Sequence, residues 1–156
     1  MTAVSLRFAI PADIAFIMAT ERGPGYELLV GRFEEDVHRA NLDDDSWLYF
    51  IGLDETSERR GFAILQDRDR RDGNCFLRRI AVVGAGKGFG KPFLTALIDW
   101  VFANTADTRF WLSVRDRNDR ARHVYAALGM IVEGPESAQE PNSLVMAITR
   151  AQWLSR

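Results

Sequence analysis

The chain reads Gly84-Ala85-Gly86-Lys87-Gly88-Phe89-Gly90-Lys91 between a β-rich run at residues 74–83 and an amphipathic segment at residues 88–104. The alternating glycines let backbone N–H groups converge on an anion without interference from Cβ atoms. A helix that starts there adds unpaired amides and the positive end of its dipole. The stretch therefore predicts a phosphate-binding loop between a strand and a helix, with a plain surface turn as the alternative.

The rest of the chain extends this strand–loop–helix unit into a mixed sheet. Hydrophobic periodicity and turn residues predict helices at 12–20, 28–40, 88–104 and 119–128, and strands at 4–9, 47–53, 61–66, 74–83, 110–114, 130–133 and 144–149. The strands at 47–83 are expected to form an antiparallel meander. The strand at 110–114 follows a crossover helix and is expected to run parallel to 74–83. We expect one α/β domain over residues 1–156, in which helices cover a mixed sheet.

Composition limits the classes of protein that the chain can belong to. Hydrophobic residues make up 47% and charged residues 27%, and the formal net charge is −2, so a disordered chain and a general attraction to nucleic acid or an anionic membrane are not expected. Cys75 is the sole cysteine, and His38 and His123 are far apart, so we expect no disulfide and no metal. No signal segment or membrane-spanning run is visible, which favours a cytoplasmic protein.

Two common nucleotide loops do not fit the glycine-rich stretch. A P-loop needs a glycine and a Ser or Thr where Ala85 and Pro92 stand, and a dinucleotide fingerprint needs glycines where Phe89 and Lys91 stand. What remains is a G-x-G-x-G run with Lys87 and Lys91 close enough to meet phosphate charge.

A second motif follows at Asn118-x-x-Ala121-x-x-x-Tyr125. Taken alone, it is equally typical of a helix N-cap, a close-packing residue and a core aromatic residue. In the expected order of elements, however, its helix begins beside the glycine loop, at the carboxyl ends of two parallel strands, where α/β folds bind ligands. Tyr125 is then a candidate proton donor to a thiolate.

With both motifs in place, the chain resembles the GNAT superfamily of acyl-CoA-dependent N-acetyltransferases. Residues 6–13 resemble the opening strand and helix of that family, residues 79–94 its acyl-CoA motif, and residues 112–130 its last motif. The family usually has Gln or Arg where this chain has Ala85, so Lys87 or Lys91 would replace that side chain. The resemblance implies a GNAT-like acyl-CoA N-acyltransferase fold, acetyl-CoA as co-substrate and a small-molecule or peptide amine as acceptor. Members of the family often form homodimers, for which the last strand is a candidate contact.

The resemblance also implies roles for individual residues. Pantetheine would pair with the edge of Ile80, Ala81 and Val82, and the Val82 N–H would polarise the thioester carbonyl. The acetyl group would pass directly to the amine while Tyr125 protonates the CoA thiolate and Asn118 positions CoA. Backbone amides and two lysines would hold the pyrophosphate, namely Gly86, Gly88, Phe89, Gly90, Lys87 and Lys91.

The acceptor side is less defined. Residues 75–83 contain no carboxylate, so Glu21, at the break after the first helix, is the candidate base through a water molecule, with Ser113 and bulk water as further options. The alternative for Glu21 is a solvated charge at the end of a helix, which is the commoner case for a glutamate. Arg78 and Arg79 are expected to point to opposite faces and to be solvated, although one of them can meet an anionic part of the acceptor. Two alternatives stay open: an acyl-CoA-binding module without turnover, and a nucleotide phosphotransferase.

Overall fold

The structure is a computed structural model that describes residues 3–23, 32–67, 72–84 and 87–156. Its strands are β1 (Ser5–Phe8), β2 (Trp47–Leu53), β3 (Arg59–Gln66), β4 (Asn74–Val82), β5 (Arg109–Arg115), β6 (Ile131–Pro135) and β7 (Ser143–Thr149). Its helices are a 3₁₀ turn, Pro11–Asp13, followed by α1 (Ile14–Glu21), α2 (Glu35–Leu42), α3 (Gly90–Asn104), α4 (Asp119–Ala127) and α5 (Arg150–Ser155). None of the helices in these ranges is long and apolar enough to cross a membrane.

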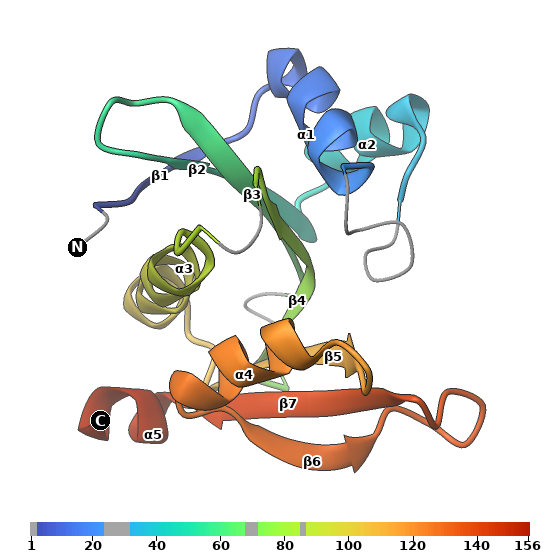
Figure 1. The fold of residues 1–156 in the computed structure, drawn as a ribbon, viewed down its shortest axis with the longest axis vertical. Coiled ribbons are helices and arrows are strands. Elements are labelled where there is room, and N and C mark those ends of the chain that lie inside the picture. Colours follow the sequence, from blue (N-terminus) through green and yellow to red (C-terminus); the bar gives the residue numbers. More distant parts are fainter. Residues whose placement is uncertain (1–2, 24–31, 68–71, 85–86) are drawn as a thin grey trace.

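The strands form one mixed sheet in the order β1-β2-β3-β4-β5-β7-β6 (Figure 1). β4 and β5 are parallel, because α3 carries the chain back over the sheet between them, and the other neighbouring strands are antiparallel. The predicted mixed α/β sheet, its meander and its parallel pair are therefore confirmed.

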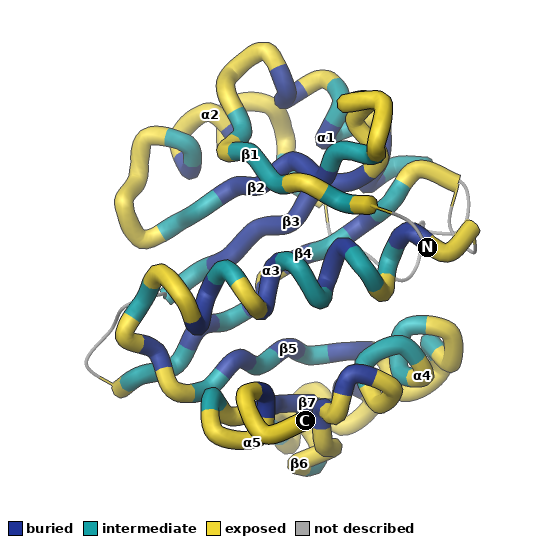
Figure 2. Tube along the Cα trace, turned by 90° about the vertical axis from the view of Figure 1, so that its left-hand side faces the viewer, coloured by how far each residue is buried: buried dark blue, intermediate teal, exposed yellow. Residues whose placement is uncertain are grey.

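Two cores cover the two faces of the sheet. The larger one buries the apolar stripe of α3, including Phe93, Leu97 and Val101, against β3, β4, β5 and β7. The smaller one packs Ile17 of α1 against β2 and β3 on the opposite face. Figure 2 shows α3 buried along one side, with α1 and α2 on the other side of the strands that they cover. The sheet is thus enclosed on both faces around β4.

The second predicted helix differs most from the structure. Its predicted residues 28–31 lie outside the described part of the chain, and residues 32–34 are not helical. α2 begins only after Glu34, whose backbone is extended, and two acidic residues occupy its first turn, where the helix dipole favours them. The Phe33 side chain, expected on the helix, instead packs its ring against His38 and Trp47. Sequence periodicity does not reveal α5, because a helix of six residues is too short to show it.

Candidate active site

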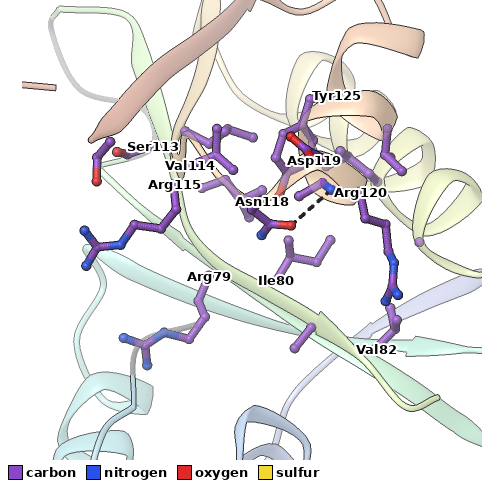
Figure 3. A pocket seen from close by; sticks show the side chains of 18 of the residues that line it. Arg79, Ile80, Val82, Ser113, Val114, Arg115, Asn118, Asp119, Arg120 and Tyr125 are labelled. Carbon is purple, nitrogen blue, oxygen red and sulfur yellow. Dashed lines mark hydrogen bonds between the residues drawn. The ribbon is translucent and has the colours of Figure 1, made fainter. Parts of the chain in front are cut away.

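A cleft opens where β4 and β5 part. The two strands pair only from Asn74 opposite Arg109 to Leu77 opposite Leu112, although β4 runs on to Val82 and β5 to Arg115. The cleft has a volume of about 660 Å³ and is walled by β4, β5, the start of α3 and α4. Figure 3 shows Ile80 and Val82 on one wall and Asn118 and Tyr125 across from them.

A β-bulge in β4 explains why the strands part at this point. Arg79 pairs with Ile64 and Leu77 pairs with Leu65, so Arg78 is an extra residue without a partner on β3. A bulge shifts side-chain alternation by one residue and increases local twist. Leu77 accordingly belongs to the α3-side core, whereas Arg79 lies on the face that α1 covers. The bulge follows directly on the last residue that pairs with β5.

The bulge also sets the direction of the backbone groups in the cleft. The Val83 N–H donates to the Arg60 carbonyl of β3 at 2.7 Å. Because successive N–H groups of a strand point to opposite sides, the Val82 N–H points away from β3, toward the cleft. The same holds for Ile80, two residues earlier. The predicted edge of Ile80, Ala81 and Val82 therefore lines the cleft.

The glycine loop leads into the first turn of α3. Gly88, Gly90 and Lys91 line the cleft, whereas Phe89 is buried and caps the helix, its carbonyl accepting the Phe93 N–H at 3.0 Å. Gly88 has a φ of +85°, a conformation that glycine adopts without strain. The first N–H groups of α3 have no partner within the helix and lie at its positive end.

Two residues of the predicted loop, Ala85 and Gly86, lie outside the described part of the chain, so their predicted contribution stays a prediction. Lys87 is exposed and is not among the residues that line the cleft.

The second motif occupies the opposite wall. Asn118 is the N-cap of α4, and its Oδ1 accepts the Ala121 N–H at 3.3 Å (Figure 3). Asn118, Ala121 and the half-buried Tyr125 all line the cleft. Asn118 is therefore both a helix cap and a cleft residue, and the fold brings together the glycine loop and the Asn118–Tyr125 motif as the sequence predicts.

Glu21 is not the solvated charge that the sequence suggests. Its side chain is 0% exposed and is not among the residues that line the cleft. Oε2 accepts from Arg79 Nη1 at 3.2 Å, and Oε1 from Arg22 Nη1 at 3.0 Å and from the Phe33 N–H at 3.4 Å. These donors engage both carboxylate oxygens outside the cleft lining. The role of base stays a prediction for Glu21, whereas its expected exposure is wrong.

A buried chain of hydrogen bonds continues from Glu21. His38 Nε2 lies 3.0 Å from Glu21 Oε1, His38 Nδ1 lies 2.8 Å from the Tyr49 hydroxyl, and Asn41 Nδ2 donates to that hydroxyl at 3.1 Å. One proton arrangement satisfies all three bonds: Tyr49 donates to Nδ1, and a neutral His38 donates from Nε2 to Glu21. Burial raises the pKa of Tyr49, so this phenol stays protonated.

Arg79 joins this network to the cleft, and sequence reasoning missed the link. Its expected solvation is wrong, because the residue is 8% exposed and its guanidinium lies 4.2 Å from the centroid of the Phe33 ring. Desolvation lowers the pKa of Arg79, against the opposing effect of Glu21. Arg78, on the bulge, is exposed as expected. The spacing of His38 and Asn41, three residues apart on one helical face, is the single local sign of this network.

Basic groups predominate around the cleft. Its lining includes the acidic residues Asp119, Glu136 and Glu140, and a larger basic set, namely Arg78, Arg79, Lys91, Arg115, Arg117 and Arg120. Among the described residues, no group of three or more His, Cys, Asp or Glu side chains is placed to hold a metal ion. The cleft therefore suits a ligand that carries negative charge.

Comparisons with known proteins agree with this geometry. The family model described as the acetyltransferase (GNAT) family matches residues 16–130. Spermidine N-acetyltransferase from Vibrio cholerae in complex with CoA and spermine superposes with a TM-score of 0.84 at 19% identity, covering 97% of this chain and 98% of that one. Mutant forms of the spermidine/spermine N-acetyltransferase of the same organism give a TM-score of 0.82 at 19% identity, covering 98% and 97%. The chain belongs to the GNAT family of acetyl-CoA-dependent N-acetyltransferases.

Proposed function

We propose that the chain works as a single domain that transfers an acetyl group from acetyl-CoA to a primary amine of a small molecule, with Tyr125 as general acid. The observation that carries this proposal is the cleft between β4 and β5, because it joins the start of α3, the backbone edge of β4 and Tyr125 in one space. The bound CoA and spermine of the Vibrio cholerae relative support a small amine as acceptor.

The phosphates of acetyl-CoA are assigned to the end of the cleft formed by Gly88, Gly90 and Lys91, which we call the CoA end. Amides at the start of α3 and the Lys91 ammonium would bind the pyrophosphate there. Gly86, Phe89 and Lys87 belong to the same proposed loop. The pantetheine arm would then run along the strand edge that faces the cleft, from Val82 to Ile80.

The chemical step follows from what faces the thioester. The neutral amine attacks the carbonyl carbon, a C–N bond forms, and the developing oxyanion is stabilised by the Val82 N–H. The C–S bond then breaks, and the CoA thiolate takes the proton of the Tyr125 phenol. The proton that the nitrogen loses as the amide forms returns to the Tyr125 phenolate through water. Asn118, whose Oδ1 is engaged as a helix cap, would contact CoA through its amide nitrogen.

The amine must lose a proton before it attacks. Glu21 is the base that the sequence suggests, yet its contacts with Arg22, Arg79 and His38 favour a structural part for it. Ser113, which lines the cleft, and water at the mouth are the acceptors that the geometry favours.

The test compares wild type with Tyr125→Phe in thiol release from acetyl-CoA across a panel of amines. We expect the variant to lose about 10²- to 10⁴-fold in kcat, the usual contribution of a general acid, while calorimetry gives an unchanged Kd for CoA. Binding of acetyl-CoA without turnover of any amine would favour the binding module. Tighter binding of ATP than of CoA would favour the phosphotransferase.

A further inference from the structure

Arg79 is both buried against Glu21 and part of the cleft wall. The bulge turns its side chain toward α1 and α2, where Glu21 and the Phe33 ring hold the guanidinium. In Figure 3, Arg79 and Arg115 extend toward the same side of the view, whereas Arg120 reaches toward Val82 on the other side. We call the part of the cleft lined by Arg79 and Arg115 the acceptor end.

Within residues 3–23, 32–67, 72–84 and 87–156, the positive charge at the acceptor end exceeds what Glu21 can balance. This carboxylate is shared between two guanidinium groups, those of Arg79 and Arg22. Arg22 lies 3.6 Å from a second carboxylate, Glu34, but that side chain is 82% exposed, so water screens the pair. A guanidinium has five N–H donors, and among the described residues the bond to Glu21 uses one of those on Arg79.

Burial makes this charge more selective. Arg79 stays protonated at physiological pH even though desolvation lowers its pKa, because arginine starts from so high a value. A cation that has lost part of its hydration interacts more strongly with an anion than an exposed cation does. It also repels a second cation more strongly, which disfavours a polyamine whose far ammonium would reach this end.

The surroundings hold Arg79 in place before any ligand arrives. The chain from Glu21 through His38 and Tyr49 to Asn41 fixes the carboxylate, and Phe33 lies against the guanidinium. A ligand therefore gains a charged hydrogen bond without having to immobilise a flexible side chain.

The acidic residues of the cleft do not offset this arrangement. Glu136 and Glu140 come from the exposed connection between β6 and β7. Glu140 lies 3.7 Å from Arg115, so part of its charge is already balanced.

We propose that the amine acceptor carries an anionic group, in the simplest case a carboxylate, which the Arg79 guanidinium binds while Arg115 attracts it at the mouth. The inference rests on the proposed acetyl transfer and names the class of its acceptor. The amine would then lie between Arg79 and the thioester, on the opposite side of the strand edge from the CoA end.

The experiment measures kcat/KM for the common amino acids, for the carboxamide of each, and for spermidine. The carboxamide keeps the amine and the side chain and removes the negative charge. We expect the best amino acid to exceed its carboxamide by about 10- to 100-fold, the range of one hydrogen bond to a charged group. Amine reactivity works against this result, because the carboxamide has the less basic amine and the larger unprotonated fraction.

Three variants assign the preference to the acceptor end. In Arg79→Gln the ratio of acid to carboxamide should fall toward unity, mainly through KM. In Arg115→Gln it should fall by a smaller factor. Arg39→Gln removes an arginine on the exposed face of α2 and should leave the ratio unchanged. Because the ratio of acid to carboxamide is measured within one variant, partial unfolding does not affect it. The double variant Glu21→Gln/Arg79→Gln repeats the test after removing both members of the buried pair, so that neither charge is left without the other.

Two outcomes would count against the proposals, and they differ. If carboxamides match the acids, or if spermidine is the better acceptor, the inference is overturned and the acetyl transfer stands. If acetyl-CoA binds but no amine of any class is acetylated, the proposed function fails and the inference fails with it.

Discussion

At the CoA end the cleft offers main-chain groups of one short loop and a helix start, whereas at the acceptor end it offers side chains supported from α1, α2, β2 and β4. Because the CoA end consists mainly of backbone groups, substitutions that change the local backbone conformation should impair it most. Because the acceptor end consists of buried ion pairs, substitutions that remove one charge of a pair should impair it most. The difference gives three expectations, which follow from the largest effect to the smallest.

Removing the Glu21 charge should have the largest effect on stability. Glu21→Gln keeps the shape of the side chain but leaves Arg79 and Arg22 without their shared counter-ion, and breaking a buried pair in this way costs about 3–5 kcal/mol. Urea unfolding followed by circular dichroism measures the loss.

The matched control is Glu35→Gln, which breaks the exposed pair with Arg39 and should cost less than about 0.5 kcal/mol. Equal losses in the two variants would show that the acceptor end does not depend on its buried charge. The double variant Glu21→Met/Arg79→Met should recover part of the stability, since an apolar pair leaves no buried charge.

At the CoA end, two glycine-to-alanine substitutions distinguish the effect of backbone strain on stability from the effect of an added methyl group on CoA binding. Gly88→Ala should lose about 1 kcal/mol of stability, because its φ of +85° is strained for alanine. Gly90→Ala has an ordinary φ and open space around the added Cβ, so its stability should stay within about 0.5 kcal/mol of wild type or rise slightly.

Calorimetry with CoA completes this comparison. If helix-start amides hold the pyrophosphate, Gly90→Ala should weaken CoA binding without loss of stability, since the new methyl group stands where the phosphate approaches. Unchanged CoA affinity in Gly90→Ala would mean that the phosphate does not approach this residue.

The smallest effect is expected at Asp13, which supports the start of α1 by accepting from Arg7, Arg59 and the Ile10 N–H. Chiefly the hydrogen bond from Arg7 lowers the pKa of Asp13 to about 2. A lowered pKa means that the ionised form stabilises the fold, so the contribution is complete above about pH 4 and is lost as the pH falls toward 2.

Wild type should therefore exceed Asp13→Asn by about 1 kcal/mol near neutral pH, a value reduced for the exposure of the two arginines, and the gap should narrow between about pH 4 and pH 2. Unfolding curves of both proteins across that range measure it. A gap that stays constant with pH would exclude the ion pairs as its cause.

The sequence predicts the CoA end of the cleft better than the acceptor end. The glycine loop, the parallel pair and the Asn118–Tyr125 motif are patterns of neighbouring residues, and they predict where the cleft lies and one part of its lining, namely residues 80–82, Gly88, Gly90, Lys91, Asn118 and Tyr125. Arg79 could not be placed, because alternation predicts its direction only for a regular strand and the bulge is set by pairing with β3. Glu21, His38 and Tyr49 lie in three elements whose approach depends on packing.

The extra residue at Arg78 shows that the cleft depends on chain length as well as on side-chain chemistry. Regular strands repeat every two residues, and this insertion moves the repeat out of phase midway along β4. A deletion of Arg78 would join Leu77 directly to Arg79 and restore the regular repeat, with Arg79 still opposite Ile64 and Ala81 still opposite Phe62 on the face that α1 covers. The N–H groups of Ile80 and Val82 would still face away from β3, so the deletion would remove the extra twist of the bulge and leave the chemistry of the cleft wall unchanged.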